Sequence, residues 1–371
     1  MANVPAHPPP ATILFAGGGT GGHLFPGIAV AEALRELDPA VRCVFVGSGR
    51  EIERRLAADH GLEHRALAVE PSTAFRRNPV RFAWRYWGAR RAARRLVDEL
   101  RPAAVVGLGG FASVPVVGAA NVPVVLLEQN AVPGRATRWL AKRASLICLS
   151  FEESRAGLPR TIAAHVTGNP VRREIAALRD DGRARSANES RMLLVLGGSQ
   201  GAAALNEAVP RAIAELRAAE RGWRIVHQAG MGNEAAVREA YRAAGVEAEV
   251  AEFFADLPER VAAASLAVSR AGGTTLAELA CAACPTILVP YPGAIADHQS
   301  LNARAFERAG GARVVEQADT PAETAGRLSA ALREPLDDAD RLARMSAAMR
   351  ALARPRAARD IATAVLQLAR R

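Results

Sequence analysis

The sequence of 371 residues predicts an α/β protein made of two doubly wound domains. Short apolar runs alternate with longer amphipathic segments along the whole chain, which is the pattern of parallel strands connected by helices. The runs are continuously apolar rather than alternating, as expected for strands that are covered on both faces. The pattern stops at residues 178–190 and then restarts, so the chain carries the same plan twice.

Strands are expected at the short runs that are rich in β-branched residues or leucine. In the first half these runs are residues 11–16, 41–47, 63–69, 103–107, 122–127 and 145–149. In the second half they are residues 192–196, 224–228, 248–253, 266–269, 285–289 and 312–315. Open sheets of this kind bind ligands beyond the carboxyl ends of their strands. We therefore expect two Rossmann-like domains that face a shared cleft.

The domain boundaries follow from changes in composition. Residues 1–10 are rich in proline and lack an apolar signal core, so we expect a disordered leader there. Residues 11–177 form the expected first domain and residues 191–353 the second. Residues 178–190 between them contain several turn formers and little apolar material, which is typical of a linker. No run approaches the roughly 18 apolar residues of a membrane-spanning helix.

Composition excludes little by itself. The formal net charge is +10, but it comes almost entirely from arginine, so a high charge is weak evidence for a nucleic-acid partner. Cysteine usage indicates buried, reduced thiols, because three cysteines lie in apolar runs and the one Cys-x-x-Cys pair lacks the second pair of a zinc site. The four are Cys43, Cys148, Cys281 and Cys284.

The first glycine cluster predicts an anion-binding loop. Residues 17–23 read Gly-Gly-Gly-Thr-Gly-Gly-His and lie between the first strand and a helix. Glycines allow an oxygen-rich ligand to approach main-chain N–H groups, and a helix start favours negative charge. The spacing also matches a dinucleotide fingerprint, which requires an acidic residue at the end of the second strand. Residues 45–50 contain none, although Arg50 leaves an NADP enzyme open as an alternative.

Further loops of the same kind follow in the second half. Residues 197–201 read Gly-Gly-Ser-Gln-Gly after a strand, and residues 270–275 read Arg-Ala-Gly-Gly-Thr-Thr before a helix. A diphosphate fits such loops. Glu278 lies one turn into that helix, where its carboxylate could accept hydrogen bonds from ribose hydroxyls. Arg172 follows the strand that ends at Thr167, where its guanidinium could bind a phosphate.

Neither a metal nor a cofactor is expected. Metal-dependent glycosyltransferases often carry an Asp-x-Asp pair after a strand, and the pair Asp338-x-Asp340 lies instead in a charged, helical stretch. The Walker pattern with its lysine is absent, which excludes the usual ATPase loop.

These motifs together resemble the MurG family of peptidoglycan N-acetylglucosaminyltransferases, which make lipid II. The resemblance runs in order from about residue 12 to 316, and no single motif decides it. The segments that carry it in the first half are residues 18–23, 25–27, 107–111 and 128–130. In the second half they are residues 168–172, 197–201, 252–254, 297–299 and 302–303.

The resemblance implies a glycosyltransferase type B fold, in which the last helix, residues 354–371, returns to the N-terminal domain. It also implies an inverting transfer without a metal. The donor would be UDP-N-acetylglucosamine (UDP-GlcNAc). The acceptor would be undecaprenyl-diphosphate-linked N-acetylmuramoyl pentapeptide (lipid I), which would be attacked through its 4-hydroxyl. The N-terminal domain would bind the acceptor and the membrane, and the C-terminal domain would bind the donor.

The resemblance also implies residue roles at the donor. The uracil would lie near Phe254 and the ribose at Glu278. The groups at the diphosphate would be Arg172, Ser199, Gly273, Thr274 and Thr275. Those at the sugar would be Thr20, Gly21, Gly22, Asn130, His298 and Gln299. Ala271 stands where the family usually has serine, which puts one donor hydroxyl in doubt.

The acceptor side is implied by the same resemblance. Its phosphate loop would comprise Gly18, Gly19, Gly109, Gly110 and Phe111, where Phe111 replaces a frequent tyrosine. From the residues themselves, His23 is the first candidate for the base that takes the acceptor's proton, because an imidazole titrates near neutral pH. Glu128, just past a strand, is the other candidate. A helix-capping or donor-contacting role for His23 remains the alternative.

Residues 75–95 mix arginines with aromatic residues, which is typical of a helix that lies on an anionic membrane surface. A lipid-linked acceptor would require such a surface, and we expect a peripheral enzyme at the cytoplasmic face of the plasma membrane. Nucleic-acid binding and a helix that packs its aromatic side chains inward are the alternatives for this segment. Other functions left open are a UDP-GlcNAc 2-epimerase, another lipid glycosyltransferase, an NADP-dependent oxidoreductase and a nucleotide-sugar sensor.

Overall fold

The computed structural model describes residues 11–18, 21–69, 79–178, 191–198 and 201–370. The chain forms two compact units. Unit 1 comprises residues 1–129, 133–167 and 357–371, and unit 2 comprises residues 130–132 and 168–356. The expected leader and almost all of the expected linker lie outside the described residues.

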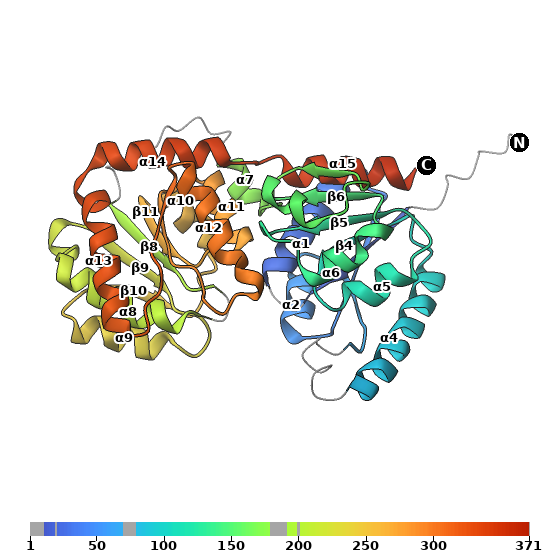
Figure 1. The fold of residues 1–371 in the computed structure, drawn as a ribbon, viewed down its shortest axis with the longest axis horizontal. Helices are drawn as coiled ribbons and strands as arrows, with labels where there is room; N and C mark the ends of the chain where they lie inside the picture. Colours follow the sequence, from blue (N-terminus) through green and yellow to red (C-terminus); the bar gives the residue numbers. More distant parts are fainter. Residues whose placement is uncertain (1–10, 19–20, 70–78, 179–190, 199–200, 371) are drawn as a thin grey trace, which may run out of the picture. The chain divides into compact units, whose positions relative to one another are not determined.

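Unit 1 is built on a seven-stranded parallel sheet in the order β3-β2-β1-β4-β5-β6-β7. The strands are β1 (Thr12–Gly17), β2 (Arg42–Gly47), β3 (Glu63–Ala66), β4 (Ala104–Gly109), β5 (Val124–Glu128), β6 (Leu146–Leu149) and β7 (Ala164–Val166). The helices, drawn in Figure 1, are α1 (Gly21–Leu37), α2 (Glu51–Asp59), α4 (Pro79–Leu100), α5 (Ser113–Ala119), α6 (Arg135–Leu140) and α15 (Ala357–Ala369).

Both faces of this sheet are buried, which explains the continuously apolar strands. Along β1, Ile13 and Phe15 belong to one hydrophobic cluster, and Leu14 belongs to another on the opposite face. The C-terminal helix α15 completes the first cluster, where Ile361 and Val365 are buried together with residues of α1. In Figure 1, α15 runs alongside the other elements of unit 1.

Unit 2 has a six-stranded parallel sheet in the order β10-β9-β8-β11-β12-β13. The strands are β8 (Met192–Leu196), β9 (Arg224–Gln228), β10 (Glu249–Ala251), β11 (Leu266–Ser269), β12 (Thr286–Leu288) and β13 (Ala312–Val314). The helices are α7 (Arg173–Ala177), α8 (Ala203–Leu216), α9 (Glu234–Ala243), α10 (Leu257–Ala263), α11 (Gly273–Cys281), α12 (His298–Arg308), α13 (Pro321–Asp337) and α14 (Ala339–Leu352).

The two parallel sheets confirm the predicted fold class, with one doubly wound sheet in each half of the chain. In unit 1 the strand order reverses between β1 and β4, and in unit 2 it reverses between β8 and β11. Crevices open at such switch points, beyond the carboxyl ends of the strands. The glycine loops after β1, β4, β8 and β11 are therefore placed where a doubly wound fold binds its ligands.

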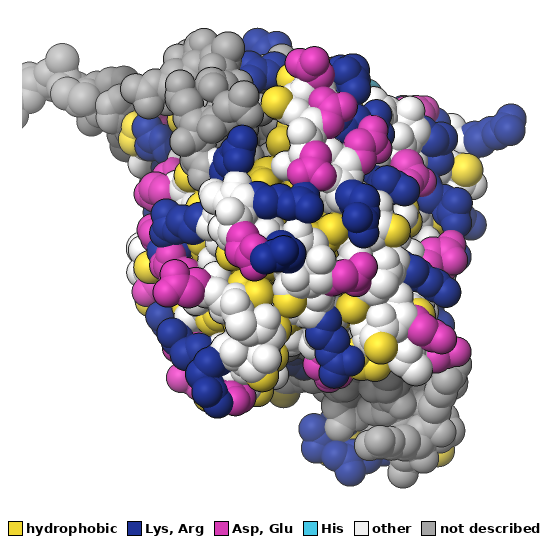
Figure 2. Space-filling model, turned by 90° about the vertical axis from the view of Figure 1, so that its left-hand side faces the viewer, with side chains coloured by type: hydrophobic (Ala, Val, Ile, Leu, Met, Phe, Trp, Pro, Cys, Tyr) yellow, Lys and Arg dark blue, Asp and Glu magenta, His cyan; other side chains and the backbone are white. Residues whose placement is uncertain are grey.

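The cysteines are buried, as the sequence predicted. All four cysteines are buried and free, and burial raises the pKa of Cys43 to about 11 and that of Cys148 to about 12. On the face drawn in Figure 2, arginines and acidic side chains are interspersed. On α9, for example, Arg238 pairs with Glu234 at 2.6 Å. Such exposed pairs contribute little to stability.

Candidate functional site

The carboxyl edge of the unit 2 sheet presents a helix start. Helix α11 begins at Gly273, shortly after β11, and its N-cap residue Gly272 has no side chain to cap the helix. The first N–H groups of a helix have no partners within it, and its dipole favours an anion at this end. The predicted loop of Gly273, Thr274 and Thr275 is thus the first turn of α11. This placement suits a diphosphate.

A buried ion pair lies one turn further along α11. The Arg172 Nε atom is 3.0 Å from Oε1 of Glu278, and the Glu278 side chain is only 7% exposed. Burial raises the pKa of Glu278, whereas the neighbouring Arg172 guanidinium lowers it. The two residues were predicted to bind different parts of the donor, and the structure brings them into direct contact.

The segment that carries Arg172 also contacts the first turn of α11. The Asn169 Nδ2 atom donates a hydrogen bond to the Thr274 hydroxyl oxygen at 3.1 Å. Asn169 is 3% exposed, so this contact is shielded from water. Residues 168–172 and the start of α11 therefore form one cluster, which we name the α11 cluster.

Asn302 on α12 joins the α11 cluster to a short segment from the first half of the sequence. Its Nδ2 atom donates to the Ala271 carbonyl at 3.0 Å and to Oδ1 of Asn130 at 3.1 Å. Its Oδ1 atom accepts from the Ala131 N–H at 2.7 Å. Asn302 is fully buried. These bonds explain why residues 130–132 belong to unit 2, although the sequence places them between strands of the first sheet.

The loop before α12 leads into the predicted sugar-binding residues His298 and Gln299, which are the first two residues of that helix. The Gln299 Oε1 atom accepts from the Tyr291 N–H at 3.0 Å, and the His298 Nδ1 atom lies 2.9 Å from the Ile295 carbonyl oxygen. Ala296 and Asp297 both adopt left-handed backbone conformations, with φ of 53° and 52°. Such conformations are costly for residues other than glycine and are concentrated at functional sites.

Arg270 fixes the other end of this loop. Its guanidinium donates to the carbonyls of Val289 and Pro290 at 3.0 and 3.1 Å, and to Oε1 of Gln317 at 2.9 Å. Its Cζ atom lies 5.5 Å from the centre of the Tyr291 ring. Burial lowers the pKa of Arg270. The side chain thus ties together the carboxyl ends of β12 and β13.

Phe254, the predicted uracil contact, follows β10. Its N–H donates to Oε1 of Gln228 at 3.3 Å, and the Cζ atom of Arg260 lies 3.9 Å from the centre of its ring. Arg260 also pairs with Glu249 and Asp256 at 2.7 and 2.8 Å. The ring is therefore held in place by a cation on one face.

In unit 1, the loops after β1 and β4 pack against each other. Gly109 and Gly110 have φ of +91° and +75°, and a Cβ built at Gly110 would lie 3.0 Å from the Gly18 carbonyl oxygen. A Cβ at Gly109 would lie 3.1 Å from Cδ2 of the His23 ring. Only glycine fits both positions. The packing brings His23, in the first turn of α1, against the predicted acceptor loop.

Glu128, the alternative base, is buried at the end of β5. It is 3% exposed, and its Oε2 atom accepts from the Gly134 N–H at 2.8 Å. This bond engages one oxygen of the carboxylate in the turn before α6. Phe111 is 42% exposed at the start of the segment before α5.

Three predicted site residues are not described by the structure. Gly19, Thr20 and Ser199 lie outside the described residues. Gly21 and Gly22 are the first residues of α1.

Asp338 of the Asp-x-Asp pair caps helix α14. Its Oδ1 atom accepts from the Arg341 N–H at 2.8 Å, as expected for an N-cap. In the described ranges, no group of three or more His, Cys, Asp or Glu side chains is placed to hold a metal ion.

Sequence reasoning assigned no role to several residues that build these sites. They are Asn169, Arg270, Asn302 and, in unit 1, Glu53 and His64. Asn169 and Asn302 are part of motifs that the sequence analysis quoted, so position within a motif was a usable signal. For Glu53 the only signal was an acidic residue at the third position of a helix, which is typical of a capping box.

Comparisons with known proteins identify the family. Residues 13–148 match the glycosyltransferase family 28 N-terminal domain, and residues 192–361 match its C-terminal domain. The UDP-N-acetylglucosamine–N-acetylmuramyl-(pentapeptide) pyrophosphoryl-undecaprenol N-acetylglucosamine transferase of Rhodospirillum centenum is 45% identical over 96% of this chain and 94% of its own length.

Two solved structures are similar to this chain over most of its length. The crystal structure of Acinetobacter baumannii MurG matches with a TM-score of 0.75 and 28% identity, over 96% of this chain and 100% of that one. A UDP-GlcNAc 2-epimerase from Neisseria meningitidis, solved with UDP-GlcNAc, matches with a TM-score of 0.67 over 96% of this chain and 100% of that one. At 12% identity, the second likeness concerns the fold alone. The resemblance noted in the sequence is confirmed: the chain belongs to the MurG family of N-acetylglucosaminyltransferases, within glycosyltransferase family 28.

Proposed function

We propose that this enzyme transfers N-acetylglucosamine from UDP-GlcNAc to lipid I and so forms lipid II for peptidoglycan synthesis. The α11 cluster carries the proposal. It combines a helix start, two threonines and a buried carboxylate–guanidinium pair at the switch point of the unit 2 sheet. Those groups match the phosphates and the ribose of a nucleotide sugar.

In this proposal, unit 2 holds the donor. The N–H groups of Gly273, Thr274 and Thr275 bind the diphosphate. Arg172 binds it as well, as does Ser199, which lies outside the described residues. The ribose hydroxyls bind Glu278, and the uracil lies against the backbone near Phe254. His298, Gln299 and Asn130, with Thr20, Gly21 and Gly22, bind the sugar. Helix dipoles and N–H groups stabilise the departing UDP, which requires no metal ion.

Unit 1 binds the acceptor. The loop of Gly18, Gly19, Gly109, Gly110 and Phe111 faces its diphosphate, and His23 takes the proton from the attacking 4-hydroxyl. The hydroxyl attacks the anomeric carbon from the face opposite UDP. The C1–O bond to UDP breaks as the new C1–O bond forms, and the configuration inverts.

Donor binding without a metal is the direct test. In calorimetry with EDTA present, we expect the protein to bind UDP-GlcNAc with a micromolar Kd and nicotinamide cofactors not at all. Binding that requires added magnesium or manganese would contradict the proposed site. Formation of lipid II from lipid I and radiolabelled donor, under the same metal-free conditions, tests the transfer itself.

We also propose that α4 docks this enzyme on the cytoplasmic face of the plasma membrane. On its inner side, Ala89 and Ala93 are buried. On its outer side, Trp84 is 74% exposed and Trp87 is 60% exposed, so these tryptophans do not pack inward. Arginines are frequent along the same helix, and the Cζ atom of Arg90 lies 5.6 Å from the centre of the Trp87 ring.

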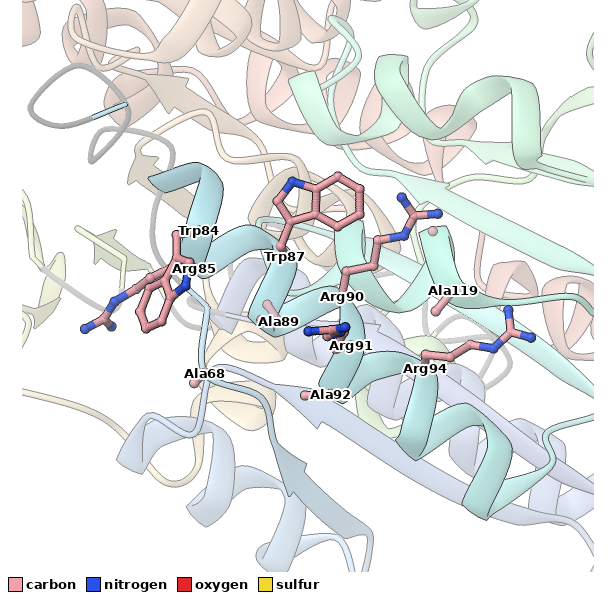
Figure 3. Close-up of a pocket in the computed structure, with 12 residues that line it drawn as sticks. Ala68, Trp84, Arg85, Trp87, Ala89, Arg90, Arg91, Ala92, Arg94 and Ala119 are labelled. Carbon is pink, nitrogen blue, oxygen red and sulfur yellow. The ribbon is translucent and has the colours of Figure 1, made fainter. Parts of the chain in front are cut away.

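A hollow runs along α4 where the helix meets α5. A pocket of about 890 Å³ is lined by Trp84, Trp87 and four arginines of α4, together with small residues of α5. Figure 3 shows the side chains of Trp87, Arg90 and Arg94 extending from this stretch of the helix. Aromatic rings at the interface and arginines at the head groups match an anionic bilayer surface. In the described part of the chain, no helix is both long and apolar enough to cross a membrane.

Vesicle sedimentation tests this docking. Replacement of Trp84 and Trp87 with alanine should lower the fraction bound to phosphatidylglycerol vesicles roughly 10-fold or more, because interfacial binding scales with buried apolar area. The variant Met231→Ala removes a residue of unit 2 that is 70% exposed and should bind like the unchanged protein. Equal loss in both variants, or binding that is insensitive to salt, would contradict docking through α4.

A further inference from the structure

Glu53 is a fully buried carboxylate behind the acceptor loop of unit 1. It lies at the third position of α2 and is 0% exposed. Its Oε1 atom accepts from the Ser48 hydroxyl at 2.8 Å, and its Oε2 atom accepts from the N–H groups of Gly49 and Arg50 at 2.8 and 3.2 Å. The bonds of a capping box do not by themselves require a buried carboxylate. The burial of this charge therefore requires a further reason.

The carboxylate separates two glycine backbones at the carboxyl edge of the sheet. A Cβ built at Gly47 would lie 2.5 Å from Glu53 Oε2, and a Cβ built at Gly18 would collide with Glu53 Oε1. At both positions a side chain would collide with Glu53, and at Gly18 the φ of +155° favours glycine as well. His64 on β3 closes the remaining side, with its Nε2 atom 3.7 Å from Glu53 Oε2 and without a hydrogen-bond partner among the described residues.

Contacts lead from this carboxylate to the proposed base. Gly18 packs on Glu53 on one side, and its carbonyl oxygen packs on Gly110 on the other. The neighbouring Gly109 lies directly against the His23 ring. Because each contact is tight, a shift of Gly18 should displace the loop after β4. That displacement would change the position of the His23 ring. Misplacement of a reacting group by about 1 Å can cost roughly 100-fold in rate.

We propose that Glu53 is a positioning residue for the transfer: it fixes the backbone of Gly18 and, through Gly110 and Gly109, the position of His23 at the acceptor. Glu53 touches neither substrate. The inference rests on the proposed roles of His23 and of the acceptor loop, and it adds the α2 carboxylate as the element that sets their geometry.

The isosteric variant Glu53→Gln tests the proposal. Its amide group removes the charge and turns one of the two acceptor atoms into a donor, so at least one of the bonds from Ser48, Gly49 and Arg50 must be lost or reversed. We expect kcat to fall roughly 10- to 100-fold, with a raised KM for lipid I. The Kd for UDP-GlcNAc should change little, because the groups proposed to bind the donor's nucleotide belong to unit 2. Glu51→Gln, which removes an exposed charge from the same turn of α2, should keep full activity.

A double-variant cycle separates positioning from general destabilisation. In the single variant Gly18→Ala, the new methyl group collides with the Glu53 carboxylate. In the double variant with Glu53→Ala, that carboxylate is absent. The two single variants of the cycle are Gly18→Ala and Glu53→Ala. If Glu53 acts through Gly18, the fold-loss of kcat in the double variant is smaller than the product of the two single fold-losses. Strictly multiplicative losses, or full activity of Glu53→Gln, would overturn the proposal.

A milder variant guards against loss of folding. Ser48→Ala removes one of the bonds to Oε1 and should lower kcat roughly 3-fold without a change in donor affinity; unchanged kcat would count against the proposal. Failure of the inference is distinguishable from failure of the proposed function. An unchanged protein that makes no lipid II refutes the function, whereas an active Glu53→Gln refutes only the positioning role.

Discussion

Replacement of His23 with alanine should lower kcat for lipid II formation by roughly 100- to 10,000-fold, the usual contribution of a general base. His23 lies in the first turn of α1, against the backbone of Gly109 in the acceptor loop. The groups proposed to bind the donor's nucleotide belong to unit 2. Calorimetry should therefore give a Kd for UDP-GlcNAc close to that of the unchanged protein.

Two further variants make this result specific. His165→Ala removes an exposed histidine from β7 of the same unit and should leave kcat unchanged. Glu128→Gln tests the other candidate base, and we expect a smaller loss of activity from it, since that carboxylate already accepts from the Gly134 N–H. Near-normal turnover of His23→Ala would remove this residue from the chemistry.

Arg172→Ala should destabilise unit 2 by about 3 kcal/mol and weaken UDP-GlcNAc binding roughly 10- to 100-fold. The stability loss arises because Glu278 stays buried without its ion-pair partner. Part of the full cost of a broken buried pair is relieved by solvent, since the Arg172 side chain is 21% exposed. Urea unfolding and calorimetry measure the two effects separately.

The pH dependence of this destabilisation has a defined sign. Burial already raises the pKa of Glu278 in the folded protein, so the folded state binds its proton more readily than the unfolded state does. Glu278 therefore contributes less to stability as the pH rises through its folded pKa. Loss of Arg172 increases that effect, and the difference between variant and unchanged protein should shrink toward acid pH.

The neighbouring Arg173 provides the matched control. It is exposed at the start of α7, and its replacement with alanine removes the same charge one residue further on. We expect it to change stability by less than about 0.5 kcal/mol. If Arg172→Ala were equally mild, or if its effect grew at acid pH, the buried-pair interpretation would be wrong.

Much of the fold could be predicted because it depends on local patterns. The strand at residues 192–196 was predicted with its observed bounds, since a strand covered on both faces must be apolar throughout. Boundaries were less accurate where a sheet edge is exposed. The run at 63–69 forms a strand only over Glu63–Ala66, in the edge strand β3.

Contacts between distant segments were beyond sequence reasoning. Arg172 and Glu278 are separated by 106 positions, and each residue alone suggested a ligand contact. Their pairing depends on how residues 168–172 pack beside α11. Likewise, three residues after β5 belong to unit 2 because Asn302 binds their backbone and side chains. A periodic pattern along one segment contains no information about such partners.

The position of α15 has a consequence for biosynthesis. Ile361 and Val365 are translated long after β1, yet their side chains fill the same core as that strand. Until α15 has been made, the face of α1 that packs against it stays uncovered, and other chains could bind there. A truncated gene ending near residue 177 would therefore yield an aggregating fragment rather than an isolated N-terminal domain, and adding a peptide of residues 357–371 in trans should restore its solubility.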